Sequence, residues 1–111
     1  MKRLIAFDVD NTLAKVGKGM LEEDITLLKE LENQGNIIAV CSGKPSYYLC
    51  GFMRQIGLQN PILIGENGSA IQFGVDLPPK KHYIQTYSEE AKETIRFFGE
   101  KIKEKIPTMF F

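Results

Sequence analysis

The chain has 111 residues and a mass of 12.6 kDa, which is the size of one domain. Apolar residues make up 43% and charged residues 25%, as in ordinary globular proteins, so the composition excludes a disordered chain, a collagen and a coiled coil. Lys and Arg together number 14, as do Asp and Glu, so the chain lacks the basic excess that is typical of nucleic-acid-binding proteins.

No segment predicts a membrane span or a secretion signal. The longest aliphatic runs, residues 4–7 and 37–41, are far shorter than the roughly 20 residues of a spanning helix. Acidic residues follow the first run too soon for a signal peptide. Cys41 and Cys50 do not form a C-x-x-C pair. We therefore expect a cytoplasmic protein with two free thiols and no membrane partner.

The first part of the chain alternates strands and helices. The predicted elements are, in order, a strand at 4–7, a helix at 22–34, a strand at 37–41, a helix from Pro45 to about residue 56 and a strand at 62–64. Each strand is a short continuous apolar run, which is typical of strands buried on both faces of a parallel sheet. Gly35 and Gly57 suit helix C-termini, and Pro45 suits the first position of a helix. This alternation predicts an α/β layer structure.

The pattern changes after Asn67-Gly68. Residues 70–73 and 82–87 predict shorter strands, separated by a segment rich in turn residues. Ser88 suits the N-cap of a long helix that follows. Apolar residues recur along that helix at helical spacing, and we expect them to be buried: Ala91, Ile95, Phe98, Ile102 and Ile106.

Two carboxylates, Asp8 and Asp10, come directly after the first predicted strand. Open α/β sheets bind ligands at the carboxyl ends of their strands, and both acids can converge there. Converging carboxylates favour a divalent cation, and their oxygen-only surroundings suggest Mg²⁺. Thr12 can hydrogen-bond the backbone of this tight loop and stabilise its shape. The alternative is an acidic turn that only ends the strand.

The segment Phe7-Asp8-Val9-Asp10-Asn11-Thr12-Leu13 resembles the first motif of the haloacid dehalogenase superfamily, Asp-x-Asp-x-Thr after an apolar strand. Most members of this superfamily are Mg²⁺-dependent phosphatases and phosphotransferases. The resemblance implies that Asp8 attacks phosphorus and becomes an aspartyl-phosphate. It implies that Asp10 is the general acid and base, and that both acids hold Mg²⁺.

The segment Cys41-Ser42-Gly43-Lys44-Pro45 resembles a second motif of the same family. Its Ser-Gly-Lys is similar to the Thr-Gly-Arg tripeptide of the type IIB or Cof-like phosphatases. The resemblance implies that the Ser42 hydroxyl and the Gly43 amide form a phosphate site with the following helix N-terminus. Lys44 stands where the subgroup has Arg, so the charge is kept and the bidentate fork is lost.

The segment Ile64-Gly65-Glu66-Asn67-Gly68-Ser69-Ala70-Ile71 resembles the Glu-Asn-Gly-Ala segment that leads into the cap domain of the subgroup. The resemblance implies that the Asn67 amide points at the phosphate; the alternative is a turn-forming Asn-Gly. It also implies the fold: residues 1–69 are half of a three-layer Rossmann-like core with a parallel sheet, and residues 70–111 begin an α/β cap. The phosphate-binding set is then Thr12, Ser42, Gly43, Lys44 and Asn67.

The family also places a Lys after the cap and one or two Asp after a fourth core strand, and nothing in residues 72–111 fits them. We therefore expect this chain to be the N-terminal portion of a phosphatase, with weak Mg²⁺ binding. Residues 108–111 look like the start of a further strand. Without the fourth strand, residues 4–7 form an exposed edge, so we expect a homo-oligomer or association through this first strand.

The predicted function is a phosphatase acting on small phosphorylated metabolites such as sugar phosphates. Two alternatives within the family stay open: a phosphomutase, and a non-catalytic remnant that binds phosphate or a protein partner. A signalling receiver domain also uses a phosphorylated Asp, but it places that Asp after the third strand, where this chain has Glu66-Asn67.

Overall fold

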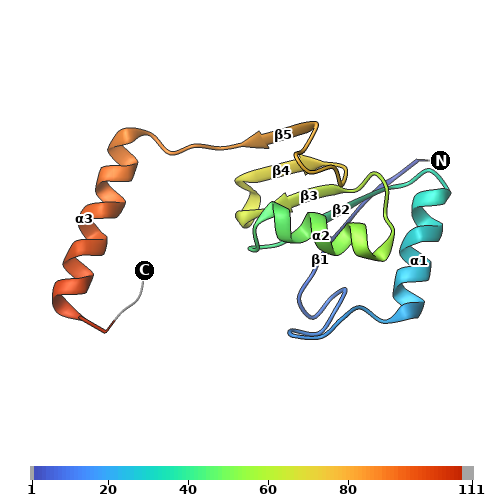
Figure 1. Ribbon diagram of the computed structural model, residues 1–111, viewed down its shortest axis with the longest axis horizontal. Helices are drawn as coiled ribbons and strands as arrows, with labels where there is room; N and C mark the ends of the chain where they lie inside the picture. Colours follow the sequence, from blue (N-terminus) through green and yellow to red (C-terminus); the bar gives the residue numbers. More distant parts are fainter. Residues whose placement is uncertain (1, 109–111) are drawn as a thin grey trace.

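The computed structural model describes residues 2–108, which form one five-stranded mixed sheet and three α-helices (Figure 1). The elements are β1 (Leu4–Asp8), α1 (Glu22–Asn33), β2 (Ile37–Cys41), α2 (Ser46–Ile56), β3 (Ile62–Gly65), the 3₁₀ turn η1 (Glu66–Gly68), β4 (Ala70–Phe73), β5 (Lys81–Ile84) and α3 (Glu89–Lys105). The strands lie in the order β1-β2-β3-β4-β5. The first three are parallel, and β4 and β5 continue the same sheet antiparallel. The predicted α/β fold with a parallel first half is confirmed.

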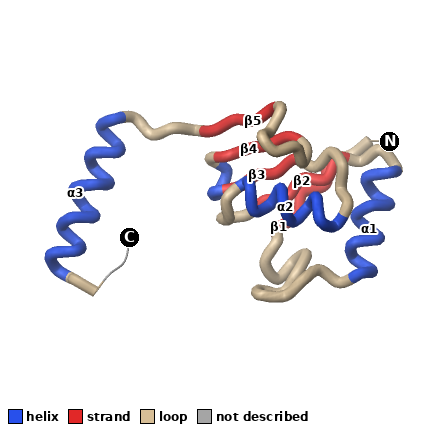
Figure 2. Tube along the Cα trace, viewed as in Figure 1, coloured by secondary structure: helices blue, strands red, loops and turns tan. Residues whose placement is uncertain are grey.

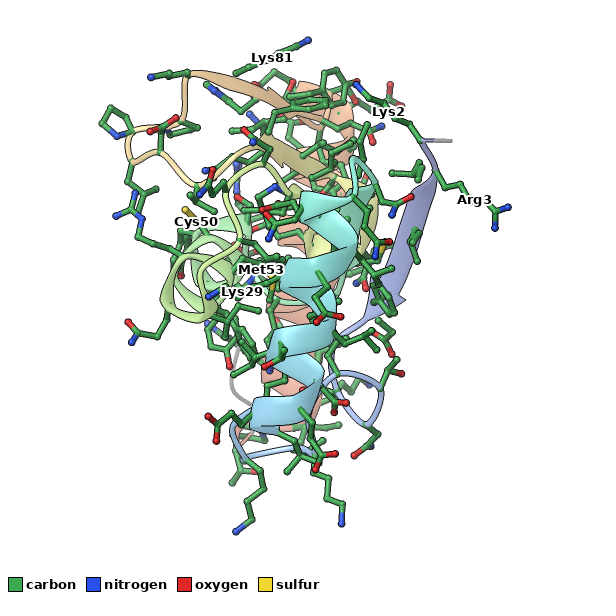
Figure 3. All side chains as sticks on the ribbon, turned by 90° about the vertical axis from the view of Figure 1, so that its right-hand side faces the viewer. Lys2, Arg3, Lys29, Cys50, Met53 and Lys81 are labelled. Atoms are coloured by element: carbon green, nitrogen blue, oxygen red, sulfur yellow. The ribbon has the colours of Figure 1, made fainter. Side chains whose placement is uncertain are left out.

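The core lies on one face of the sheet. Alternate residues of the strands point to this face, among them Ile38, Val40 and Leu63, each fully buried. Leu28 of α1 and Met53 of α2 pack against them, so both helices cover the same face. Figure 3 labels Met53 and Cys50 on α2.

The first strand is less buried than the sequence predicts. β1 pairs only with β2 and forms one edge of the sheet. Its residues alternate between exposed and half-buried, and the Leu4 side chain is 64% exposed. The prediction of a strand buried on both faces was wrong here, because β1 has one neighbouring strand and a helix layer on one side only.

Several predicted element boundaries differ slightly from the observed ones. Pro45 is the N-cap of α2 and lies just before the helix, whereas it was expected at the first helical position. The C-cap of α1 is Gln34, so Gly35, where the cap was expected, lies one residue beyond it. Gly57 ends α2 as predicted, in the left-handed conformation with φ 92°. The last strand covers residues 81–84, where 82–87 had been predicted.

The last helix stands apart from the sheet. Ser88 caps α3 as predicted, and its side chain accepts a hydrogen bond from the Ala91 backbone N–H at 3.1 Å. No residue of α3 is buried, and Ile95 and Phe98 are 58% and 59% exposed. The expected buried stripe is therefore exposed, because an extended connection holds the helix away from the rest of the fold (Figure 2).

The two thiols, Cys41 and Cys50, are free, as expected. Within residues 2–108 there is no helix with the length and apolar character that a membrane crossing requires. The apolar segment at the C-terminus that predicted a further strand lies, from Met109 onward, outside the described residues.

Candidate active site

A tight loop positions the two acids. Asp8 is the last residue of β1, and its Oδ1 accepts a hydrogen bond from the Val9 N–H at 2.9 Å. The Val9 carbonyl then accepts hydrogen bonds from the backbone N–H groups of Thr12, Leu13 and Ala14 at 3.2, 2.9 and 3.1 Å. Val9 and Leu13 are buried in the core. Their burial anchors the loop, while Asp8 and Thr12 remain exposed above it.

The loops after β2 and β3 are joined by backbone hydrogen bonds. The Ser42 N–H donates to the Ile64 carbonyl at 2.9 Å, and the Asn67 N–H donates to the Ser42 carbonyl at 3.1 Å. The Glu66 N–H donates to the Lys44 carbonyl at 2.9 Å. The predicted phosphate-site residues on the two loops are therefore held at a common position by the backbone.

Gly65 allows the two loops to approach this closely. A Cβ atom at this position would lie 2.7 Å from the Ser46 backbone nitrogen and 2.8 Å from the Lys44 carbonyl oxygen. No real Cβ atom tolerates such contacts with backbone, so only glycine fits. Asn67 follows with φ 56°, a left-handed conformation to which Asn is better suited than most residues.

A hollow of about 410 Å³ lies where the carboxyl ends of the parallel strands meet. Its lining consists of Asp8, Cys41, Ser42, Gly43, Ile64, Asn67 and Gly68. The structure thus brings together Asp8, Ser42, Gly43 and Asn67, which come from three separate segments of the sequence. Cys41, Ile64 and Gly68 line the hollow although they were not predicted as site residues; the positions of Cys41 and Ile64 near the ends of β2 and β3 were the available signal.

Lys44 and Asp10 form an ion pair beside this hollow. The Lys44 Nζ lies 3.6 Å from the Asp10 Oδ2, and the two side chains are 35% and 42% exposed. The Lys44 ammonium also lies 5.1 Å from the centroid of the Tyr48 ring. Tyr48 was not predicted as a site residue, although its position four residues after Lys44, at the start of α2, was a usable signal. Lys44 therefore holds a positive charge between the acid loop and the phosphate-site loop.

Thr12 does not line the hollow that holds Asp8, Ser42, Gly43 and Asn67. It lines a second hollow of about 530 Å³ beside the loop between β1 and α1. This hollow is lined by Asn11, Thr12, Leu13, Ala14, Lys15, Lys18, Gly19, Leu21 and Asp24. The Thr12 backbone stabilises the acid loop through its bond to the Val9 carbonyl.

The site offers carboxylate oxygens but no complete metal cage. Among residues 2–108, no group of three His, Cys, Asp or Glu side chains is placed to hold a metal ion. Mg²⁺ is commonly held by one or two carboxylates together with waters and substrate phosphate oxygens. Asp8 and Asp10 fit that donor set, whereas the Lys44 charge beside Asp10 opposes a cation in the absence of phosphate.

The chain matches known proteins along nearly its whole length. The family model described as haloacid dehalogenase-like hydrolase matches residues 5–110. A phosphoglycolate phosphatase from Staphylothermus marinus is 32% identical over 108 residues, which cover 96% of this chain and 43% of the relative. The chain therefore spans less than half the length of this curated relative.

Solved structures show the same fold. A haloacid dehalogenase-like hydrolase from B. subtilis superimposes with a TM-score of 0.76 at 20% identity, over 90% of this chain and 34% of that one. Another haloacid dehalogenase-like hydrolase, from Bacteroides thetaiotaomicron, gives a TM-score of 0.73 at 19% identity, over 91% of this chain and 38% of that one.

Proposed function

The chain belongs to the haloacid dehalogenase-like hydrolase family, and from this premise we propose that it carries the phosphoryl-transfer site of a Mg²⁺-dependent phosphatase. The observation that carries the proposal is the hollow in which Asp8 meets Ser42, Gly43 and Asn67. It combines one carboxylate with neutral hydrogen-bond donors, and the Lys44 cation lies at its side. An anionic phosphate monoester matches this combination of groups.

The proposed reaction uses Asp8 as the nucleophile. A carboxylate oxygen of Asp8 forms a bond to phosphorus while the bond from phosphorus to the leaving oxygen breaks, and Asp10 gives that oxygen a proton. Asp10 then takes a proton from water, which attacks the aspartyl-phosphate and releases inorganic phosphate and the Asp8 carboxylate. Asp8 and Asp10 would hold Mg²⁺, which would neutralise part of the phosphate charge.

The substrate in this proposal is a small phosphorylated metabolite. Phosphoglycolate is the first compound to test, because the relative from Staphylothermus marinus carries its name. Sugar phosphates form the second group. Ser42, Gly43 and Asn67 contact only the phosphoryl group in this proposal, so they select the reaction and leave the choice of substrate to surfaces outside the hollow.

A second candidate function is phosphate binding without turnover. It is favoured by the absence of a third carboxylate near Asp8 and Asp10 within residues 2–108. Loss of one preorganised charge-stabilising group typically lowers a catalytic rate by roughly 10²–10³. The chain would then retain the anion site without measurable turnover.

The test measures binding and turnover on the same protein. The purified chain is assayed with phosphoglycolate and an aryl phosphate in the presence of Mg²⁺, and orthovanadate binding is followed by amide NMR shifts at Ser42, Gly43 and Asn67. We expect vanadate to shift these amides and expect slow turnover that Asp8→Asn abolishes. Asp76→Asn is the matched control, because Asp76 is a surface acid paired with Lys80.

The outcomes separate the two candidates. Vanadate binding without any turnover selects the binding function over the phosphatase. A chain that neither binds vanadate nor turns over phosphate, while remaining folded, contradicts both. Turnover that survives Asp8→Asn contradicts the covalent mechanism.

A further inference from the structure

The backbone of Lys44 is fixed more firmly than its charge. Its N–H donates a hydrogen bond to the Ser42 Oγ at 3.1 Å, and its carbonyl accepts one from the Glu66 N–H at 2.9 Å. Both bonds tie the residue to the loops that border the hollow. The ammonium group, however, lies at the end of a long stem with many rotamers, so a fixed backbone does not by itself fix the position of the charge.

Asp10 and Tyr48 both lie beside the Lys44 ammonium group, and they act on it differently. The Asp10 Oδ2 lies 3.6 Å from the Lys44 Nζ and carries the opposite charge. The Tyr48 ring, whose centroid lies 5.1 Å from the same nitrogen, is neutral and attracts a cation through its electron-rich face. The carboxylate therefore offsets the positive charge that a bound phosphate would meet, whereas the ring leaves that charge intact.

The Tyr48 ring is supported from the core. Its backbone N–H donates to the Pro45 carbonyl at 3.1 Å, in the first turn of α2. One turn later lies Phe52, whose ring centroid is 6.4 Å from that of Tyr48, with the two ring planes tilted by 57°. Phe52 is half-buried and packs against the hydrophobic core. A line of contacts therefore runs from the core through Phe52 and Tyr48 to the charge beside the hollow.

We propose that Tyr48 is a positioning residue for phosphate binding, whose ring keeps the Lys44 ammonium group beside the hollow while this group exchanges Asp10 for a phosphoryl oxygen. The inference rests on the proposed function, since it requires an anion in the hollow. A bound phosphate and the Asp10 carboxylate compete for one ammonium group, so the ion pair weakens as the anion binds. The ring contact persists, because the ring attracts the cation whichever anion the cation faces.

The exposure of the two side chains sets the size of the effect. Tyr48 is 46% exposed, and the Lys44 side chain is 35% exposed. A cation–π contact in such a partly exposed place changes a binding constant by about two- to fivefold. Removal of the lysine charge itself should cost more, because a charge-assisted hydrogen bond to the phosphate is then lost as well.

The test is a double-mutant cycle in orthovanadate affinity, measured by calorimetric titration of the intact chain. Tyr48→Leu keeps an apolar side chain beside Phe52 and removes the ring, so it should weaken vanadate binding about two- to fivefold. Tyr48→Phe retains the ring face and should keep the wild-type affinity. In the Lys44→Met background, Tyr48→Leu should have no further effect, because the cation that the ring positions is gone.

A second measurement follows the contact itself in the absence of any anion. Protons that lie over the face of an aromatic ring resonate upfield in the NMR spectrum. The Lys44 Hε resonances of the anion-free chain should therefore move downfield in Tyr48→Leu and stay in place in Tyr48→Phe. This measurement does not depend on the affinity of the hollow for vanadate.

Tyr47→Leu is the matched control. Tyr47 precedes Tyr48 in α2, is 69% exposed and, within residues 2–108, has no ring contact with a cation. The substitution removes the same kind of ring from the same turn of the helix, so it should change neither the vanadate affinity nor the Lys44 resonances. Urea unfolding verifies that each variant is folded under the conditions of the titration.

Four results would overturn the inference. Equal vanadate affinity of the wild-type and Tyr48→Leu chains would show that the ring does not affect the phosphate site. An equal loss with and without Lys44 would show a structural effect that does not act through the lysine charge. Lys44 resonances that Tyr48→Leu leaves in place would show that the ring contact is absent in solution. A wild-type chain that binds no vanadate contradicts the proposed function and the inference with it, whereas the other three results leave the proposed function standing.

Discussion

The ion pair between Lys44 and Asp10 is weak, but the position of the Lys44 charge indicates a role in the site. Its ion pair with Asp10 is more than one-third exposed on both sides, so solvent screening leaves it little effect on the free energy of unfolding. The position of its charge is more informative. The ammonium group lies between the acid loop and the loop that carries Ser42, and the Tyr48 ring flanks it. We therefore assign Lys44 an electrostatic role toward a bound phosphate.

The first prediction concerns this lysine. Lys44→Met should change the free energy of unfolding by no more than about 0.5 kcal/mol, because exposed ion pairs contribute little. It should weaken orthovanadate binding by about tenfold, the usual scale of one charge-assisted hydrogen bond. Calorimetric titration and urea unfolding measure the two effects. Lys80→Met removes another surface pair, with Asp76, and should change neither quantity. Unchanged vanadate affinity in Lys44→Met would remove the assigned role.

The second prediction concerns Gly65. Gly65→Ala should lower the free energy of unfolding by about 1–3 kcal/mol, because the new methyl group collides with the backbone of residues 44 and 46. It should also weaken vanadate binding, since the two loops must move apart. The matched control is Gly51→Ala on α2, where a Cβ meets nothing within 4 Å. That variant should be more stable by about 0.5–1 kcal/mol, from helix propensity alone. Equal urea midpoints for both variants would contradict the packing argument.

Among the elements, β1 and α3 have the least covered apolar residues, and the exposed edge predicted for residues 4–7 is observed. Both have the apolar pattern of buried elements, but β1 is an edge strand and α3 has no buried residue. β1 presents the backbone groups of Leu4–Asp8 at a sheet edge, which favours pairing with another strand. Association through this first strand stays a prediction.

The third prediction concerns the stability of α3. Ser88→Ala removes the side-chain acceptor of the Ala91 N–H and should destabilise the helix by about 1 kcal/mol. Helical signal at 222 nm should fall, while the melting temperature of the core should stay the same because α3 has no buried residue. Thr94→Ala is the control, since the Thr94 hydroxyl bonds to the Glu90 carbonyl inside the helix and caps nothing. A joint loss of helix and core would show that α3 is packed on the sheet.

At the scale of the whole molecule, the chain has a compact part and a projecting part. Residues 2–84 contain the sheet, both core helices and both hollows, whereas α3 projects from them and extends the molecule to 53 Å along its longest axis. β4 and β5 belong to the same sheet as the parallel strands. The division into a core at 1–69 and a cap at 70–111 stays a prediction, and truncation of the chain tests it.

The fourth prediction compares two truncated chains. Residues 1–85 should keep a cooperative unfolding transition and the vanadate site. Residues 1–69 should unfold at markedly lower urea concentration. The reason is that β4 pairs with β3, and Gln72 of β4 is 3% exposed and donates a hydrogen bond to the Cys50 Sγ of α2 at 3.4 Å. A fully stable 1–69 chain would place the domain boundary at residue 69.

Local sequence patterns predicted the alternating elements, and the resemblance to the family predicted the composition of the site. Periodicity and glycine positions are local properties, so α2 was predicted within one residue at its start and ended at Gly57 as expected. The family resemblance implied that Asp8, Ser42 and Asn67 serve one phosphate site, and they line one hollow at the carboxyl ends of the parallel strands.

Which apolar surfaces are covered and which charges meet became visible only in the folded chain. An apolar stripe shows that a face can be buried, but burial requires a second surface within reach. α3 has the stripe and, within residues 2–108, no surface against it, whereas α1 and α2 have the sheet. The contact of Lys44 with Asp10 likewise depends on how two loops, 34 residues apart in the chain, are held by the strands between them. Such contacts are set by packing, which no local pattern encodes.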